Sequence, residues 1–483
     1  MAFGIKHVSF IMLICNNNKL DVDQTPRSRG AILPIVIVFG AILLMLFSGL
    51  TNFLVLQQKA GHDEVGREQA LEAAEAGLEY YRWRLAHAPT DYLTTTNIEQ
   101  DVLDPQGGAI AHYVLTVTPP DACGSSVSVI SVGWSLAKPA IKRTLATQLG
   151  RPSLAQYAFI NNNNVWFGPA SNTLGPIHGN AGIRMDGTHN SLVTSAVATY
   201  QCGWAHGCNP TQTKPGVWGN GPGGGLGLWE FPVPTIDFNA ITLDLAALKT
   251  TAQNAGTYRG ASGAFGYQVT LKQNDTYEVR KVTGLHNNVV GCDATDCYSH
   301  SDRIKNTQLL GTYDLPPDAC DGSHVLFFED SKVWVEGTSR SKVTIVAARF
   351  PDTPETNASI IINSDIKHPN PKDSQIALIA QKDVRIPLYS NNILEIDAVV
   401  VAQKGGFTRW RYDSNYAPNH LRSSLTVLGT IVSNKTSGVA WGNPVISGYQ
   451  TRSYSFNSDL VYNPPPFLPT LGEVETISWS EVQ

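Results

Sequence analysis

Four of the seven cysteines form two short pairs that could close covalent loops. The pairs stand in CGWAHGC, residues 202–208, and in CDATDC, residues 292–297. Cysteines in an oxidising compartment form disulfides, so these spacings predict two local bridges. Of the other three cysteines, Cys15 lies in the first 30 residues, which we expect to be removed, and two remain to pair across the sequence. Six cysteines allow other connectivities, which the spacing does not exclude. The expected bridges are Cys202–Cys208, Cys292–Cys297 and Cys123–Cys320.

A metal site is the competing interpretation of the first pair, because His206 lies between Cys202 and Cys208. Thiolates and imidazoles bind zinc, but this spacing matches no common zinc pattern. The sequence therefore favours the disulfide and predicts neither a metal nor a cofactor.

Two groups of polar residues could do acid–base chemistry. The first lies among closely spaced glycines, where polar side chains usually satisfy tight turns. The second combines carboxylates with an arginine, as polysaccharide-cleaving sites do, but no pair has a spacing that predicts convergence. With no phosphate loop, nucleophile elbow or HExxH motif, we expect no enzymatic activity. The groups are His178, Arg184, Asp186 and His189, and Asp365, Asp383, Arg385, Glu395 and Asp397.

Composition indicates a turn-rich β protein behind an apolar start. Only 16% of the 483 residues are charged and the net charge is -5, which argues against a nucleic-acid partner. The 42 glycines and 28 prolines favour short strands and turns. Trp204, Trp218 and Trp410 could stack on sugars, although single tryptophans in a β domain are more often core or turn anchors.

From Ala31 to Leu56 no residue is charged, and a helix of this length spans roughly 39 Å, enough to cross a bilayer. Arg27 and Arg29 precede it, which places the N-terminus in the cytoplasm and the rest outside. No proline follows Ile35 until after Ala88, so the helix continues beyond the membrane. Apolar residues at three- and four-residue steps predict that it docks on a domain, namely Leu71, Ala74, Leu78, Tyr81 and Leu85.

Basic residues, then Gly30, then a long apolar helix that becomes amphipathic, resemble the N-terminus of type IV pilins and of minor, PilX-type pilins. The segment EQALEAAEAGLEYYRWRL, residues 68–85, is similar to the stretch that follows the membrane helix in those minor pilins. The resemblance implies a leader over residues 1–30, cleavage by prepilin peptidase between Gly30 and Ala31, and packing against other pilin-like subunits. The implied membrane anchor includes Ile35, Phe39, Leu43, Leu46, Leu50 and Leu54.

One position departs from the major pilins. Their fifth mature residue is a glutamate, and here it is Ile35, preceded by Pro34, which fits a first helical turn. The absence of the acid favours a tip, priming or low-copy subunit over a repeated shaft subunit.

Beyond the helix, 31–88, the chain divides into three β regions. Residues 89–150 alternate in short strands and predict a small antiparallel sheet. Residues 151–330 are rich in Asn, Gly and Trp, with one helix expected at 240–255, capped by Asn239. Residues 331–483 end in a proline-rich tail, with Phe467 and Trp479 as expected anchors.

A weak repeat in the last region predicts a parallel β-solenoid, with a β-sandwich as the alternative. ALIAQKDVRI (377–386) and VVVAQKGGF (399–407) share an apolar run ending in Ala-Gln-Lys at an offset of 22 residues. KVTIVAARF (342–350) and GTIVSNKTSG (429–438) read as looser copies.

The sequence thus predicts an α+β, then mainly β, pilin-like minor or tip subunit of a type IV pilus or related secretion system. We expect it to be anchored in the cytoplasmic membrane, with its C-terminal domain outside, and to act in pilus assembly and surface adhesion through a glycan or protein ligand. The alternative is an uncleaved, membrane-anchored β-helix protein that binds or cleaves polysaccharide.

Overall fold

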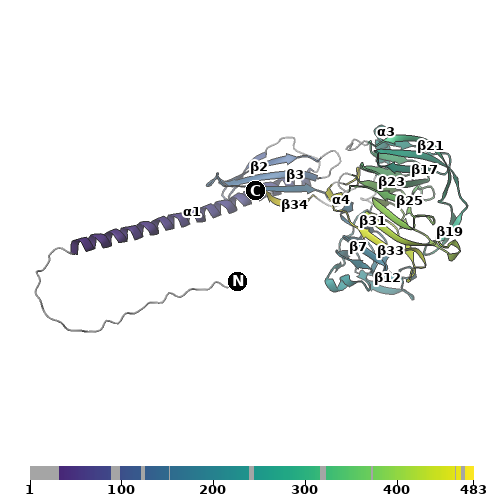
Figure 1. Cartoon of the computed structure of the whole chain (residues 1–483), viewed down its shortest axis with the longest axis horizontal. Helices are drawn as coiled ribbons and strands as arrows, with labels where there is room; N and C mark the ends of the chain where they lie inside the picture. The colour runs from purple at the N-terminus through teal and green to yellow at the C-terminus, as the bar shows by residue number, and fades with distance from the viewer. Residues whose placement is uncertain are drawn as a thin grey trace, which may run out of the picture. The chain divides into compact units, whose positions relative to one another are not determined.

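Figure 1 shows the computed structural model of the chain. The described residues are 32–88, 98–120, 126–151, 153–238, 244–315, 323–370, 374–462, 464–468 and 474–482. The chain divides into two units, Met1–Val65 and Gly66–Gln483.

The N-terminal element is one helix, α1 (Ile32–His87), of 56 residues. It is long and apolar enough to cross a membrane. The six residues predicted to form its anchor all lie on α1 and are 50–65% exposed. Within this unit the apolar surface of α1 is therefore not covered by protein.

The second part of α1, from Gly66 onward, packs on a small antiparallel sheet, as the apolar spacing predicts. Ala74, Leu78, Tyr81 and Leu85 are buried against Leu115, Val129 and Leu145 among others. The sheet has the order β1-β2-β3-β4-β34. Its strands are β1 (Ile98–Leu103), β2 (Ala109–Thr118), β3 (Ser126–Ser135), β4 (Lys142–Gly150) and β34 (Glu475–Val482).

The last strand changes the predicted domain boundaries. We placed residues 331–483 in one region, but β34 pairs antiparallel with β4 and belongs to the small sheet. The β domain between them is therefore an insertion between two neighbouring strands. Phe467 is 40% exposed and Trp479 is 52% exposed, so neither is the buried anchor that we expected.

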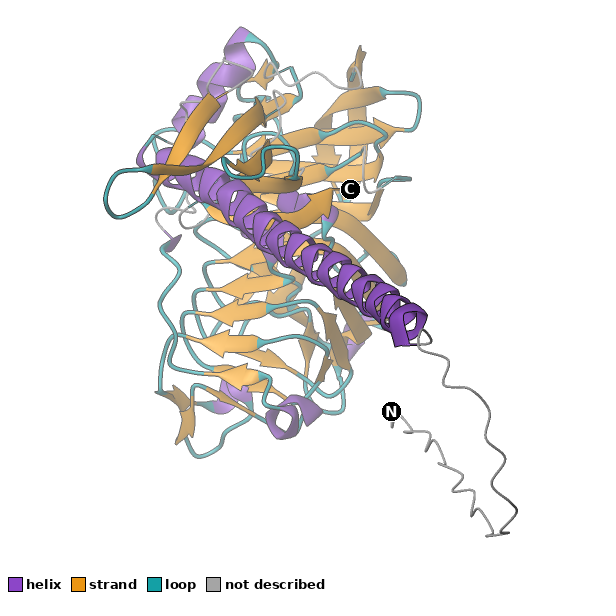
Figure 2. Cartoon of the chain, turned by 90° about the vertical axis from the view of Figure 1, so that its left-hand side faces the viewer, coloured by secondary structure: helices purple, strands orange, loops and turns teal. Residues whose placement is uncertain are grey.

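The inserted domain is a stack of short parallel strands, visible as rungs in Figure 2. Parallel pairing is what the solenoid interpretation requires and what a sandwich lacks. One face consists, in spatial order, of β16 (Thr257–Arg259), β22 (Val325–Phe328), β24 (Val343–Ala347), β26 (Ile376–Ala380), β28 (Ile393–Ala402), β31 (Leu421–Ser433), β5 (Phe159–Asn161), β8 (Ile177–Gly179), β11 (Val193–Ser195) and β15 (Trp229–Glu230).

Two further faces complete the rungs. The second contains the ends of β23 (Lys332–Thr338) and β25 (Ser359–Lys367), the first halves of β28 and β31, then β33 (Ser447–Ser455), β7 (Ser171–Leu174) and β10 (Thr188–His189). The third contains β17 (Tyr267–Lys272), the starts of β23 and β25, β27 (Val384–Arg385) and β29 (Phe407–Thr408), and, as a separate sheet, β6 (Val165–Phe167), β9 (Ile183–Met185) and β14 (Val217–Trp218).

The spatial order of the rungs is not the order of the chain. Residues 159–230 form the rungs at one end, and the chain then resumes at Thr257 at the other end and winds back. The last rung stacks on the first, because Ile431 pairs with Phe159 and Tyr454 with Thr173. We call this junction the seam. The predicted boundary at residue 330 also lies inside the stack, since β22 pairs with β24.

The sequence repeat identifies neighbouring rungs of one face. Ala377 pairs with Val399 and Ala380 with Ala402, which is the offset of 22 residues read from the sequence. The two looser copies form β24 and the end of β31, on either side of these strands. The repeat in the sequence therefore corresponds to strands that pair directly in the stack.

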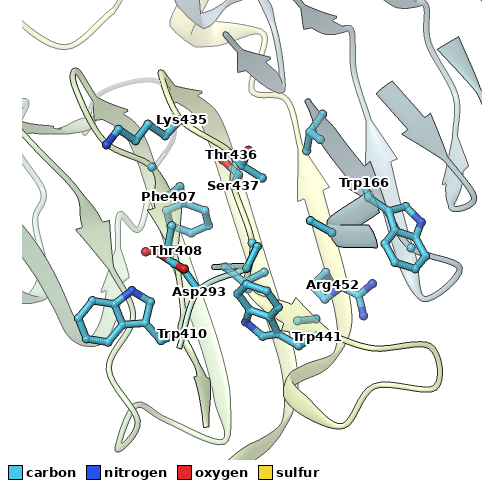
Figure 3. Close-up of a pocket in the computed structure, with 18 of the residues that line it drawn as sticks. Trp166, Asp293, Phe407, Thr408, Trp410, Lys435, Thr436, Ser437, Trp441 and Arg452 are labelled. Atoms are coloured by element: carbon cyan, nitrogen blue, oxygen red, sulfur yellow. The ribbon is translucent and has the colours of Figure 1, made fainter. Parts of the chain in front are cut away.

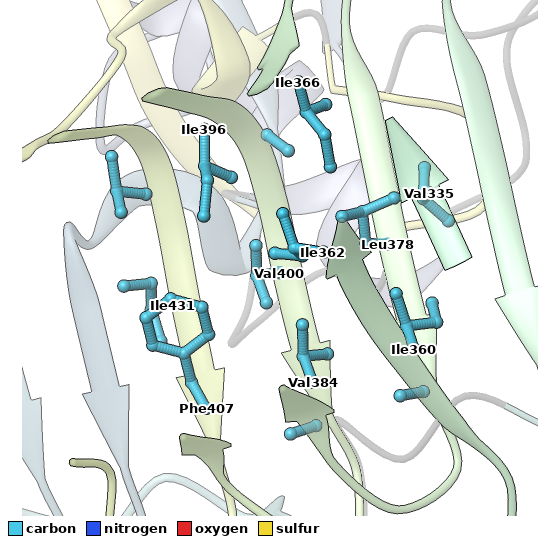
Figure 4. Packing of buried hydrophobic residues seen from close by; sticks show 14 of the residues in the cluster. Val335, Ile360, Ile362, Ile366, Leu378, Val384, Ile396, Val400, Phe407 and Ile431 are labelled. Atoms are coloured by element: carbon cyan, nitrogen blue, oxygen red, sulfur yellow. The ribbon is translucent and has the colours of Figure 1, made fainter. Parts of the chain in front are cut away.

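Inward-facing aliphatic side chains fill the stack (Figure 4). The core is continuous across the seam, since Ile431 and Phe407 share one cluster with Phe159 and Phe167. Asparagines join the rungs at one corner: the Nδ2 of Asn162 donates to the Oδ1 of Asn434 at 2.8 Å, and Asn180 donates to Asn162 at 2.8 Å. The run NNNN, residues 161–164, thus includes part of this ladder.

The remaining elements lie at the ends and edges of the stack. Antiparallel strands are β12 (Thr199–Cys202), β13 (Gln212–Pro215), β18 (Thr276–Leu285), β19 (Val289–Cys292), β20 (Cys297–His300), β21 (Ile304–Asp314), β30 (Arg411–Tyr412) and β32 (Ala440–Trp441). Helical turns are η1 (Leu154–Gln156), η2 (Trp204–His206), η3 (Pro222–Leu226), η4 (Ser414–Tyr416) and α4 (Asp459–Tyr462).

The predicted helix at 240–255 is shorter than expected. Helix α3 spans Leu245–Asn254, and its N-cap is Asp244, whose carboxylate accepts from the backbone N–H groups of Ala246 and Ala247. Asn239, the expected cap, lies outside the described residues.

Close packing of α1 on the small sheet gives a first prediction. A Cβ at Gly77 would lie 2.6 Å from the Oγ of Ser131 and 2.8 Å from the Cδ2 of Tyr113, whereas a Cβ at Gly61 meets nothing within 4 Å. Overpacking costs about 1–3 kcal/mol, which exceeds the roughly 1 kcal/mol that alanine gains in a helix. We expect Gly77→Ala to lower the thermal unfolding midpoint of the detergent-solubilised chain, measured by circular dichroism.

Gly61→Ala is the matched control, because it makes the same change in the same helix without a close contact. It should leave the midpoint unchanged or raise it. Equal behaviour of the two variants would contradict the packing described for Gly77.

Candidate functional site

The third face of the stack is interrupted at the seam. Between β29 and β6 no ladder is present among the described residues, and only an isolated bridge joins Thr408 to Gly438. The chain from Asn434 to Ile446 takes the place of a strand there, apart from the short β32. A missing strand leaves a recess in an otherwise continuous surface.

A groove of about 980 Å³ occupies this recess. We call it the seam groove. Its walls come from the first rung, the last rungs and the hairpin β19–β20. In Figure 3, Trp166, Trp410 and Trp441 come from three separate segments and line the same groove. Small polar side chains accompany them, namely Thr408, Thr436, Ser437 and Asn443.

The three tryptophans are half-buried, but their ring faces differ in what they contact. The guanidinium of Arg184 lies over the ring of Trp166, 4.3 Å from its centroid, and the guanidinium of Arg385 lies over the ring of Trp410 at 5.0 Å. Trp441 makes no ring or cation contact with a described residue, and its indole N–H donates to the carbonyl of Arg409 at 2.9 Å. The edge of its indole is therefore fixed by this hydrogen bond, and the side chain lines the groove.

Both predicted short disulfides are present, and each holds a loop at the rim of the seam groove. Cys202 bonds Cys208, and the enclosed Ala205 and His206 line the groove. Cys292 bonds Cys297, and the enclosed Asp293, Ala294 and Thr295 also line it. Closing a loop of this size lowers the conformational entropy of the unfolded chain by the equivalent of about 2 kcal/mol, and the bond also restricts the loop in the folded protein. The disulfides therefore stiffen two sides of the groove.

The bond between Cys202 and Cys208 also overturns the metal interpretation of CGWAHGC, since neither sulfur is a free thiolate. Cys123 and Cys320, which we expected to pair, lie outside the described residues, as do Gly30 and Ala31.

A buried charge cluster lies beside the groove. Asp302 pairs with the ammonium of Lys332 at 2.8 Å and with Arg385 at 3.5 Å. Although burial opposes ionisation, these cations hold the pKa of Asp302 below its usual value. Arg385, predicted as a site residue, is thus held both by Asp302 and by the face of Trp410.

His300 lies between this cluster and the groove wall. Its ring is 3.9 Å from that of Trp410, and its Nε2 is 3.2 Å from the hydroxyl of Tyr412. Burial lowers the pKa of His300 to about 4, against the opposite effect of Asp302. The imidazole is therefore neutral near pH 7.

Arg452 is a second cation in the groove, and it is only 7% exposed. Its Nη1 donates to the carbonyls of Tyr449 and Gln450 at 3.2 and 3.0 Å. No carboxylate of a described residue pairs with it, and burial lowers its pKa. A buried guanidinium without an acidic partner has hydrogen-bonding capacity left for a ligand.

The two acidic side chains of the groove are engaged locally. One carboxylate oxygen of Asp293 accepts from the backbone of Thr295 and Asp296, and the Oδ1 of Asp383 accepts from Gly406 N–H at 3.1 Å. Both carboxylates therefore order turns at the rim.

The first predicted polar group is dispersed into structural contacts. Arg184 pairs with Asp186 at 2.8 Å, and Asp186 also accepts from the indole of Trp166. The other two members bind neighbouring loops: His178 contacts Thr194 and Asn180, and His189 accepts from Trp229 and contacts Ser191. These side chains do not converge on one point.

The second predicted group is divided between two faces of the stack. Asp383 and Arg385 lie on or beside β27 and line the groove. Asp365, Glu395 and Asp397 lie on β25 and β28, where Lys367 pairs with Asp365 and Glu395. They are not groove residues.

Sequence reasoning missed most of the groove. Trp441 and Arg452 carry no motif, and they approach Trp166 only because the last rung stacks on the first. Trp410 is the one tryptophan among Trp204, Trp218 and Trp410 that lines the groove. The two cysteine pairs were the available signal, since both mark its rim.

No family model matches the chain, and no curated protein matches it. Among solved structures, the competence-associated pilin ComZ from Thermus thermophilus aligns over 86% of this chain and 97% of its own, with 13% identity and a TM-score of 0.29. A TM-score of this size does not establish a shared fold, so no assignment is based on it.

The buried His300 gives a prediction for pH dependence. In the unfolded chain its pKa is about 6.5, so between about pH 6.5 and pH 4 the unfolded chain binds a proton that the folded chain does not. The free energy of unfolding should therefore fall as the pH falls through this window. Denaturant unfolding of the full chain in detergent measures this slope.

His300→Asn is the informative comparison, because an amide keeps polarity without titrating. For this variant, the slope of the unfolding free energy against pH should be shallower than that of the wild type. The difference corresponds to at most one proton taken up on unfolding. The neighbouring Asp302, whose pKa lies below its usual value, is present in both proteins, so the difference between the two slopes reports the imidazole. Parallel slopes would contradict a neutral, buried His300.

Proposed function

We propose that this chain is a pilin-like minor or tip-type subunit, anchored by α1, that displays an inserted ligand-binding domain for surface adhesion. The observation that carries the proposal is the continuous helix α1, which is exposed and apolar at its start and docks on a small antiparallel sheet at its end. The type IV pilin resemblance at residues 27–87 supports the same interpretation.

The inserted β domain supports adhesion more than catalysis. Its groove offers aromatic faces and cations, while its two carboxylates order turns. The two disulfides support an oxidising compartment, which agrees with a cytoplasmic N-terminus and a domain on the outer side of the membrane.

The absence of an acid at Ile35 supports a low-copy position. A glutamate there would have to find a cationic partner in an apolar environment, since an unpaired buried charge is costly. Without it, this subunit lacks that pairing when it packs among other pilin-like helices. We infer a place at the tip or in priming of a pilus or related secretion machine.

Cleavage by prepilin peptidase tests the proposal directly. We expect peptide mass spectrometry of the protein from sheared surface filaments to find a mature N-terminus at Ala31. Gly30→Leu should abolish this cleavage and leave the full-length chain in the membrane, because a bulky residue replaces the glycine of the processing site.

Gly40→Leu is the matched control. It makes the same change in the apolar segment, at a position with no neighbour within 4 Å, and should leave cleavage intact. Retention of residues 27–30 in the wild-type protein from envelopes would refute the pilin pathway and favour a permanently anchored surface protein.

A further inference from the structure

The seam groove differs in charge from the rest of the chain. Four basic side chains and two acidic ones line it, whereas the chain carries a net charge of -5. The basic residues are Lys382, Arg385, Lys435 and Arg452, and the acidic ones are Asp293 and Asp383. A locally positive recess on a negatively charged protein attracts anions, and this attraction weakens as the salt concentration rises.

Three of these cations have no acidic partner among the described residues. Arg385 is neutralised by Asp302, but neither Lys382, Lys435 nor Arg452 forms an ion pair with a described carboxylate. Arg452 is buried, so leaving it unpaired is costlier than leaving an exposed lysine unpaired. A bound carboxylate would supply the missing partner, and the planar guanidinium fits that geometry.

Trp441 supplies a complementary apolar contact. It lies on β32, which pairs with β33, and Trp441 is opposite Ser447. Arg452 lies five residues further along β33, which corresponds to about 16 Å of extended chain. In the view of Figure 3, Arg452 lies between Trp441 and Trp166. Both side chains line the groove from the paired strands β32 and β33.

We propose that the seam groove binds an acidic oligosaccharide, with a sugar ring on the face of Trp441 and a sugar carboxylate on Arg452. Thr408, Thr436, Ser437 and Asn443 line the same groove and supply hydrogen bonds to hydroxyl groups. The loops closed by the two disulfides keep the rim rigid, which lowers the entropy cost of binding. This proposal names the ligand class for the adhesion proposed above. It rests on that function only in assuming that the inserted domain is displayed at the cell surface.

Titration calorimetry of the full chain in detergent tests the proposal. The probe is an oligogalacturonate, and its control is the same oligosaccharide with its carboxylates reduced to alcohols. We expect the acidic probe to bind, its affinity to fall as salt rises, and the reduced probe to bind at least about tenfold more weakly, since a charge-assisted pair is lost.

Three variants locate the site. Arg452→Gln and Trp441→Ala should each weaken binding at least about tenfold, and Lys435→Glu should weaken it about threefold or more. Lys435 is exposed and forms no ion pair with a described carboxylate, so its substitution tests the groove even where a substitution at the buried Arg452 disturbs the fold. Circular dichroism verifies the fold of each variant.

Two control variants make the matched changes outside the groove. Lys305→Glu reverses the same charge at an exposed position on β21, and Trp479→Ala removes a tryptophan on β34 that is 52% exposed. Neither residue lines the groove, so both variants should bind like the wild type. Loss of binding in a control, with binding intact in the groove variants, would overturn the location.

The identity of the ligand has its own refuting outcomes. Equal binding of the reduced oligosaccharide would overturn the need for a carboxylate. Equal or tighter binding of a single-stranded oligonucleotide would show that phosphate and base stacking explain the groove better, and no binding of the acidic probe would overturn the proposal. Cleavage at Gly30 does not depend on groove residues, so either proposal can fail without the other.

Discussion

The inserted domain depends on the stacking of its last rung on its first. An insertion between β4 and β34 must begin and end close together, because these strands are neighbours in one sheet. A stack of rungs wound in simple chain order would place its two ends far apart. Here the chain starts at the seam, resumes at the far end and returns, so parallel pairing of β31 with β5 and of β33 with β7 brings both ends to one level.

The same arrangement explains the groove. A ladder across the seam must join strands that are remote in sequence, and two of the three faces achieve it. On the third, among the described residues, the segment after β31 joins β29 only through the bridge between Gly438 and Thr408, and the recess remains. Such a recess needs support at its edges, and the corner ladder of Asn162 and Asn434, the neutral His300 and the two disulfides provide it. Ligand sites on rigid scaffolds often occur where regular pairing is broken.

Local and periodic signals made part of this structure predictable. The apolar spacing from Leu71 to Leu85 gives the docking face of α1, and the Ala-Gln-Lys repeat gives the exact pairing of β26 with β28. Closely spaced cysteines bond as expected. The seam, by contrast, has no local signal: Trp166 and Trp441 line one groove because rungs that are remote in sequence stack there, and neither segment alone indicates this. The return of β34 was missed for the same reason, since an exposed edge strand needs no strong apolar pattern.

If α1 acts as we propose, its apolar surface sets the energetics of assembly. Side chains such as Phe39 and Leu46, 64% and 65% exposed in the isolated chain, must be covered by lipid or by other helices. Both environments are apolar, so moving α1 from lipid into a bundle of helices changes the burial of its apolar surface little. The free energy of this transfer is therefore set by side-chain packing and polar contacts. Ile35 adds no buried charge to that exchange, whereas a glutamate would add a pairing requirement. The subunit can then enter an assembly without selecting a partner through that position.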